Sequence, residues 1–215
     1  MTASSAVLHL TLANLSPGLA EAGADGEALL SAFGHLGAIP GVLHLGAVRG
    51  TADGSTHSLA LFVYLRDRAS LEAFGTDGRH IDFVRRSLLG PVTDLVTADV
   101  SASVLPPQTY SAAAAFAVGF RAETFDWQVR KLLEGLERPL VVSGGPSLDS
   151  LRGGQRYRAG ALALWPGDGS AWEAVASEFR RRWRSACQPA LSEFALVIGE
   201  ARPLLVAAAG EERVS

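Results

Sequence analysis

The chain has 215 residues, of which 48% are hydrophobic and 19% are charged, and its formal net charge is −3 at pH 7. This apolar content excludes an intrinsically disordered chain, and the absence of a basic excess argues against nucleic-acid binding. A single cysteine, Cys187, excludes an internal disulfide framework and a multi-cysteine metal site. Because there is neither an apolar run of roughly 18 residues nor a Lys/Arg-rich leader, we expect a cytoplasmic protein without membrane contact.

The first hundred residues alternate between short apolar runs, which predict strands, and apolar residues at helical spacing, which predict helices. In chain order we expect a strand, a helix, two strands joined by a Gly-containing turn, an interrupted helix and a strand: residues 6–13, 25–36, 42–48, 57–65, 70–88 and 91–100. The first of these helices ends before Pro40, since proline cannot continue a helix. The resulting order is β-α-β-β-α-β.

The same order recurs after a Pro-containing linker at 103–109. The expected elements are residues 112–120, 124–136, 140–142, 157–165, 170–183 and 189–200, with a Gly-rich loop at 143–154. We therefore divide the chain into a first half at 1–102, a second half at 110–206 and a flexible tail at 207–215.

Each β-α-β-β-α-β unit predicts a ferredoxin-like fold of the α+β class, in which both helices cover one face of an antiparallel sheet. The other face of each sheet is left bare. Two such sheets in one chain can cover each other's bare faces, so we expect one pseudo-dimeric α+β barrel with the helices outside. We also expect a cavity between the two sheets.

Several motifs of the first half match a known family. They are Val7-Leu-His9-Leu, Ile39-Pro-Gly-Val42, Thr56-His57-Ser-Leu, Leu71-Glu-Ala-Phe74, Arg79-His80-Ile-Asp-Phe83 and Gly90-Pro91-Val. On these residues the first half resembles the stress-responsive dimeric α/β-barrel (Dabb) family. The second half keeps the order of elements without the motifs, so the chain resembles a tandem form of that family with a degenerate second copy.

The resemblance also implies an activity. The family includes polyketide cyclases of the olivetolic acid cyclase type, which close a linear polyketide by aldol condensation without a cofactor. His80 matches their catalytic histidine, and His57 and His9 match two further histidines. Phe74 stands where these cyclases have a tyrosine, so Tyr64 or Tyr157 would have to supply a hydroxyl. The resemblance thus implies a cofactor-independent, metal-free cyclase for an apolar, polyketide-like molecule.

The residues themselves support part of this interpretation. Imidazole is a suitable general base beside a carbonyl group, and His80 follows a Gly-containing break from which a side chain can reach a cavity. His9 and His57 lie on strands that pair in this fold, so we expect them to be neighbours, either orienting a substrate or forming a structural pair. The residues expected to line the substrate cavity are Leu59, Leu61, Tyr64, Phe74, Phe83, Tyr157 and Trp165.

Other polar residues have simpler interpretations. His35 and His44 are expected at the surface or at helix ends, and Arg180–Arg182 with Arg184 on the solvated side of a helix. The histidine spacing does not favour a metal site. Two alternatives to the cyclase stay open: a non-catalytic, stress-responsive or ligand-binding protein, and a cofactor-free monooxygenase of the antibiotic-biosynthesis type. In each case two chains can pair as a homodimer.

Overall fold

A computed structural model of the chain describes residues 6–16, 23–50, 55–118, 132, 139, 141–146, 148, 159–166, 169–187 and 194–206. Eight strands form one antiparallel sheet in the order β4-β1-β3-β2-β8-β5-β7-β6. Their bounds are β1 Ala6–Leu15, β2 Val42–Gly50, β3 Leu59–Leu65, β4 Val92–Ala102, β5 Ala112–Val118, β6 Val141–Pro146, β7 Ala159–Trp165 and β8 Phe194–Val206.

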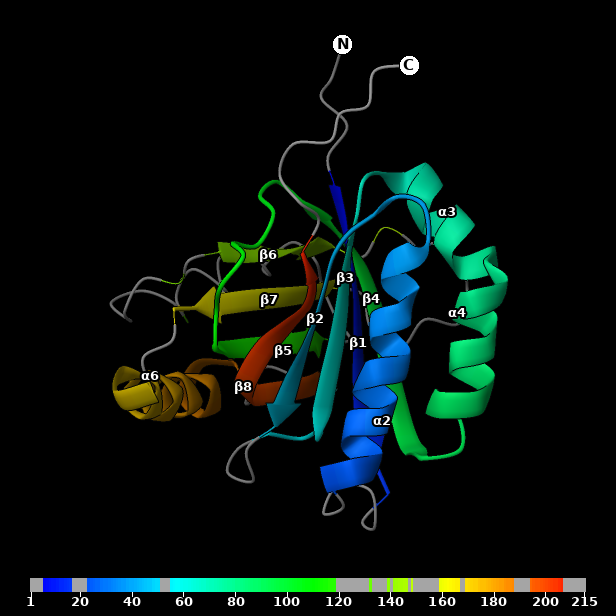
Figure 1. Cartoon of the computed structure of the whole chain (residues 1–215). Coiled ribbons are helices and arrows are strands. Elements are labelled where there is room, and N and C mark those ends of the chain that lie inside the picture. Colours follow the sequence, from blue (N-terminus) through cyan, green and yellow to red (C-terminus); the bar gives the residue numbers. More distant parts are fainter. Residues whose placement is uncertain are drawn as a thin grey trace.

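The described helices lie outside the sheet. They are α2 Gly23–Gly34, which continues as a 3-10 turn over His35–Ala38, α3 Arg68–Thr76, α4 Gly78–Phe83 with a π-helical turn over Val84–Leu88, and α6 Gly169–Arg182 with a π-helical turn over Trp183–Cys187. Figure 1 shows α2, α3 and α4 on the outer side of β1–β4, and α6 against β5–β8. The predicted helix at 124–136 lies outside the described residues except for Leu132.

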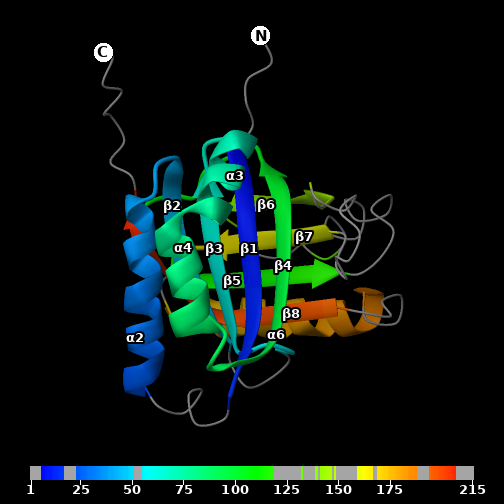
Figure 2. The same ribbon diagram turned by 90° about the vertical axis from the view of Figure 1, so that its right-hand side faces the viewer.

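The first four and the last four strands have the same spatial order, and they join where β2 pairs with β8. Figure 2 shows the two groups face to face, with their strands crossing at a steep angle. At the far end β4 lies against β6, and the backbone N–H of Leu148 donates to the carbonyl of Asp99 at 2.7 Å. The sheet is therefore almost closed, and the predicted pseudo-dimeric α+β barrel of two ferredoxin-like units is confirmed.

The strand pleat separates three buried layers. On β1, Leu8, Leu10 and Leu12 face the barrel interior, where they pack with side chains from both strand groups. The alternate residues of β1 face outward, and Val7 packs with α2, α3 and α4. A third layer lies between the second strand group and α6. The described residues between the two sheets thus form a packed core.

Several expected boundaries differ from the structure, and the last strand, expected to end at 200, continues to Val206. The predicted loop at 143–154 begins too early, because β6 extends to Pro146. A Cβ on Gly144 would collide with Ala161 of β7, so this glycine permits close strand pairing and does not mark a turn. The strand predicted from residue 57 begins at Leu59, and His57 lies in the bend before it.

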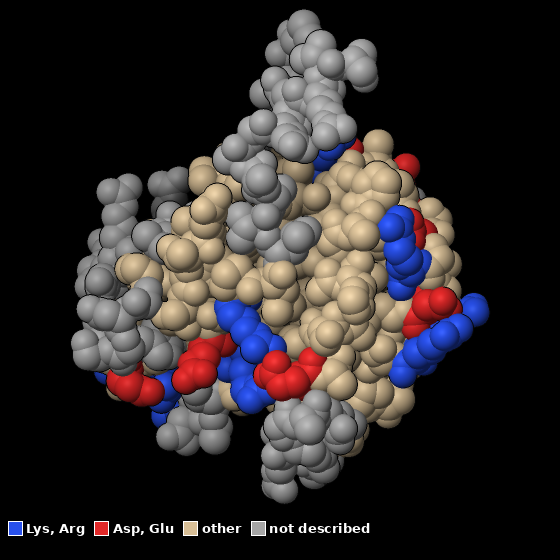
Figure 3. Space-filling view, in the orientation of Figure 1, with Lys and Arg blue, Asp and Glu red and all other residues tan. Residues whose placement is uncertain are grey.

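Acidic and basic side chains form mixed clusters on the face shown in Figure 3. In one of them Arg202 of β8 donates to Glu27 of α2 at 2.7 Å, which joins the two halves at the surface. None of the helices among the described residues combines the length and the apolar character needed to cross a bilayer.

Candidate functional site

A pocket of about 130 Å³ lies between the outward face of the first strand group and the helices α2 and α4. It is therefore on the helix side of the sheet, and the expectation of a site between the two sheets was wrong for this pocket. The reason is the pleat, which turns His9 and Thr11 of β1 away from the barrel interior. Most of the lining is apolar, and four polar side chains face it: His9, Thr11, His80 and Thr97.

His9 and Asp99 form a dyad at this pocket. They lie opposite each other on the paired strands β1 and β4, and Nδ1 of His9 is 2.6 Å from Oδ1 of Asp99. The side chain of Asp99 is only 9% exposed, so its carboxylate is committed to this partner. When Nδ1–H donates to the carboxylate, Nε2 carries the free lone pair, and the hydroxyl of Thr11 is 3.4 Å from it. This arrangement suits a general base whose third group fixes its tautomer.

His80 approaches the same pocket from α4. Its ring centroid is 4.5 Å from that of Phe74 and 6.4 Å from that of His9. Burial and the nearby His9 lower the pKa of His80, and the carbonyl of Gly75 and the carboxylate of Asp77 oppose this shift only in part. The ring is therefore neutral at pH 7, and its buried Nδ1 makes no hydrogen bond of good geometry within the described residues.

The start of α4 is fixed by a local network that places His80. Asp77 is the N-cap and accepts a hydrogen bond from the backbone N–H of Arg79 at 2.8 Å. The guanidinium of Arg79 binds Asp77 at 2.7 Å and also donates to the carbonyl of Ala38, after α2, at 2.8 Å. These hydrogen bonds hold the pKa of Asp77 near 2 and connect α4 to the α2 side of the pocket.

The structure brings together some of the residues predicted for the site. Leu61, Phe74 and Phe83 line the pocket with His9 and His80. Other predicted residues lie elsewhere or are not described, as follows: Leu59 packs in the helix layer, Tyr64 points into the barrel interior, Trp165 packs under α6, and Tyr157 is outside the described residues.

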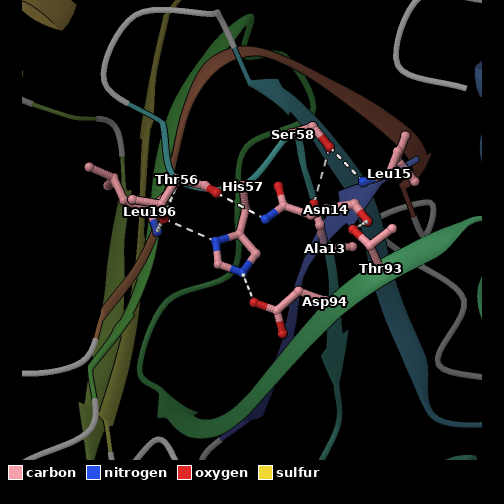
Figure 4. Close-up of polar contacts among 9 residues, drawn as sticks. All are labelled: Ala13, Asn14, Leu15, Thr56, His57, Ser58, Thr93, Asp94 and Leu196. Atoms are coloured by element: carbon pink, nitrogen blue, oxygen red, sulfur yellow. Dashed lines mark hydrogen bonds and ion pairs between the residues drawn. The ribbon is translucent and has the colours of Figure 1, made fainter. Parts of the chain in front are cut away.

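His57 is not part of this pocket, and the expectation that it neighbours His9 was wrong. Figure 4 shows His57 between Leu196 of β8 and Asp94 of β4, near Ala13–Leu15 at the end of β1. Its backbone N–H donates to the carbonyl of Leu196, Nδ1 is 3.0 Å from Oγ1 of Thr56, and Nε2 is 3.4 Å from a carboxylate oxygen of Asp94. Burial lowers the pKa of His57 although Asp94 opposes this, and the residue connects the two halves structurally.

His44 is also placed differently from the expectation, because it is buried and not at the surface. Its Nε2 is 2.7 Å from the hydroxyl of Tyr110 inside the barrel, and burial lowers its pKa to about 4. Nearby, Tyr64 donates to Ser143 of β6 at 2.9 Å. His35, by contrast, is exposed after α2 as predicted. Within the described ranges, no group of three or more His, Cys, Asp and Glu side chains is placed to hold a metal ion.

Asp99 is the member of this candidate site that was not predicted from the sequence. Its signal is the alternation along β4, in which Val96, Ala98 and Val100 face the barrel interior. A carboxylate between such residues faces the helix-covered side, where it needs a partner. The β-α-β-β-α-β order places that strand beside the first, and so beside His9.

The amino-acid sequence matches no family model and no curated protein. Among solved structures, an anthrone oxidase-like protein aligns with 95% of this chain and 97% of its own, at a TM-score of 0.58 and 14% identity. A candidate monooxygenase from Fusobacterium nucleatum aligns with 94% of this chain and 95% of its own, at a TM-score of 0.55 and 12% identity. These likenesses show a shared fold over nearly the whole chain.

A Dabb family protein from Mesorhizobium loti, with a ferredoxin-like fold, aligns with 48% of this chain and 99% of its own, at a TM-score of 0.40 and 20% identity. Membership of that family stays a prediction that rests on the motifs of the first half.

Proposed function

We propose that the protein is a cofactor-independent enzyme that removes a proton beside a carbonyl group of an apolar, polyketide-like molecule and closes a ring by aldol addition. The observation that carries this proposal is the His9–Asp99 dyad, which opens into a largely apolar pocket beside a second, neutral histidine. A base in such a pocket suits a weak carbon acid, because low polarity strengthens the electrostatic interactions that stabilise an enolate.

In the proposed reaction Nε2 of His9 takes the proton from the carbon between two carbonyl groups. The electron pair of the broken C–H bond moves to a carbonyl oxygen, and the charge that develops on His9 is stabilised by Asp99. His80, as a neutral imidazole, donates a hydrogen bond to the enolate oxygen. The enolate carbon then attacks a third carbonyl, farther along the same molecule, and the resulting alkoxide takes the proton back from His9.

This assignment changes the roles that the family resemblance implied. His80 becomes the hydrogen-bond donor and His9 the base, because His9 is the histidine held by a buried carboxylate. Phe74 lies 5.7 Å from His9 and 4.5 Å from His80 by ring centroids, and it forms an aromatic wall beside both imidazoles. His57 has no chemical role in this proposal.

A second candidate uses the same first step. An enolate or phenolate formed by His9 can react with molecular oxygen, which would make the protein a cofactor-free monooxygenase. The whole-chain fold likeness to an anthrone oxidase-like protein and a candidate monooxygenase supports this alternative. Oxygen uptake with an anthrone separates the two, because ring closure consumes no oxygen.

The shared step is tested by deuterium exchange. An aryl 1,3-diketone is incubated with the protein in D2O, and NMR follows the loss of the proton between the two carbonyls. We expect acceleration by the wild-type protein, and His9→Ala to lower it by about a hundredfold or more. His35→Ala is the matched control, since His35 is exposed and outside the pocket, and it should keep the full rate. Equal rates in wild type and His9→Ala would contradict the proposal.

A further inference from the structure

A second pocket, of about 260 Å³, lies in the other half of the molecule, against the C-terminal end of α6. One wall is formed by Arg180, Trp183 and Arg184, and the opposite wall by Phe194 and Leu196 of β8 together with Ser55 and Thr56. It is about twice the volume of the histidine pocket. None of its described lining residues is acidic.

The wall made by Ser55 and Thr56 is fixed in place. Oγ of Ser55 accepts the backbone N–H of Ile198 at 3.0 Å, and Oγ1 of Thr56 accepts that of Leu196 at 2.8 Å. The backbone N–H of Thr56 donates to the carbonyl of Leu196 at 2.8 Å. Ser55 and Thr56 of the first half are therefore attached to β8, and this wall of the pocket is fixed before any ligand binds.

The arginines of α6 fall into two groups. Arg181 and Arg182 each donate to Glu178, at 2.6 and 2.7 Å, so their charges are compensated. Arg180 and Arg184 lie one turn apart on the pocket side and have no carboxylate partner among the described residues. The expectation that the whole run is a solvated face was therefore wrong for Arg180, which is half-buried.

Arg180 also has an unused donor. Its Nε is buried and makes no hydrogen bond within the part of the chain that the structure describes. A buried donor of a charged group without an acceptor is costly, and a ligand oxygen would remove this cost. The planar guanidinium fork is suited to carboxylate and phosphate oxygens.

Two aromatic side chains, Trp183 and Phe194, also line the pocket. The rings of Trp183 and Phe194 lie 5.5 Å apart by centroid with an interplanar angle of 60°. Flat apolar groups pack well against such edge-to-face pairs. The pocket therefore combines two arginines that lack a carboxylate partner in the described part of the chain with an apolar wall.

We propose that this pocket binds a small aromatic carboxylate, whose carboxylate is held by Arg180 and Arg184 and whose ring packs against Trp183 and Phe194. The site is separate from the histidine pocket, and this inference does not depend on the proposed reaction.

The test is a ligand-observed 19F NMR titration of the full chain with 4-fluorobenzoate. Arg180→Gln and Arg184→Gln should each weaken binding by about tenfold, the loss expected for one charge-assisted hydrogen bond. Arg181→Gln is the matched control, because it removes an arginine of the same helix whose charge is already paired with Glu178. It should bind as the wild type does.

Further probes identify the anion. 4-Fluorobenzamide, which has the same shape without charge, should not bind, and 4-fluorophenyl phosphate should bind more weakly than the carboxylate. Stronger binding of the phosphate, or of inorganic phosphate alone, would overturn the carboxylate assignment. Equal weakening by Arg181→Gln, or no binding of 4-fluorobenzoate to the wild-type protein, would overturn the site.

A measurement on the unmodified protein guards against variants that fail to fold. In a 15N NMR spectrum of the wild-type chain, 4-fluorobenzoate should shift the indole N–H signal of Trp183. Shifts confined to other tryptophans would place the ligand elsewhere and contradict the proposal.

Discussion

In each half a layer of side chains lies between the strands and the helices that cover them, and the two halves build this layer from different residues. In the first half His9 of β1 lies opposite Asp99 of β4, on the face that α2 and α4 cover. In the second half the corresponding strands β5 and β8 place Ala114 opposite Ile198, on the face that α6 covers. One pair can hold and move a proton, and the other can only pack.

The surrounding residues differ in the same direction. Under α6 the layer contains Trp165, Phe179 and Trp183, with Phe179 fully buried between the two tryptophans. Next to His9 and His80 the corresponding layer leaves a pocket. The layer of the second half is therefore tightly packed, and that of the first half contains the pocket and the dyad that the proposed function uses. Four predictions test this division, each with its own substitutions.

The largest expected effect is that of Asp99→Asn on proton transfer. Without the carboxylate, His9 loses the group that fixes its tautomer and stabilises its charged form, so kcat for deuterium exchange should fall by about a hundredfold, no more than for His9→Ala, with KM little changed. Asp99→Glu should restore part of the rate. Glu200→Gln, an exposed carboxylate of β8, is the control and should keep the wild-type kcat. A fall in kcat accompanied by a rise in KM and by partial unfolding would indicate only a structural role for Asp99.

The next effect concerns the packed layer of the second half. Phe179→Ala removes a fully buried ring and should lower the free energy of unfolding by about 4 kcal/mol. Phe74→Ala in the first half should cost about half as much, because one side of that ring already faces the pocket. Urea denaturation of both variants measures the difference. Equal costs would show that the two layers are packed alike.

A smaller effect concerns pH and the barrel interior. His44 has a folded pKa of about 4 against an ordinary value of 6.5, so below 6.5 the unfolded chain binds a proton there that the native chain does not. Stability should therefore fall as the pH falls from 6.5 towards 4, with His44 contributing about 2 kcal/mol between pH 7 and pH 5. Denaturant titrations of wild type and His44→Gln should show a flatter pH dependence in the variant. Parallel curves would mean that His44 is not buried as a neutral ring.

The smallest expected effect is that of Tyr110→Phe. It removes the hydroxyl that lies 2.7 Å from Nε2 of His44, and the free energy of unfolding should fall by about 1 kcal/mol. The deuterium-exchange rate should not change, because this pair faces the barrel interior and the pocket is on the other side of the sheet. A loss of exchange activity would place the chemistry in the interior.

The fold was predictable from the order of elements. The spacing of apolar residues and the positions of glycine and proline, which indicate this order, are local properties of the chain. The meeting of His9 and His80 was anticipated only as a family pattern, since it depends on how α4 packs against β1. Predicting the contact between Asp99 and His9 would have required the register of β4 against β1. A single sequence does not specify this register. The burial of His44 was not predicted, because His44 contacts Tyr110, a residue beyond the first strand group.

The position of His44 nevertheless had a readable sign. His44 lies on the same face of β2 as Gly46 and Val48, and a Cβ on Gly46 would collide with Phe62 and Tyr110. A glycine at that point of a strand indicates close packing against the inner face. The pocket at α6 had no comparable sign, since only the structure separates Arg180 and Arg184 from the arginines paired with Glu178.

The proposed chemistry takes place on the helix side of the first half. A crystal structure of the protein soaked with an unreactive aryl 1,3-diketone analogue would locate the ligand directly. We expect the ligand between β1 and α4, with an oxygen or the central carbon in contact with Nε2 of His9 and the aromatic ring against Phe74. A ligand bound only in the barrel interior, or only against α6, would contradict this proposal.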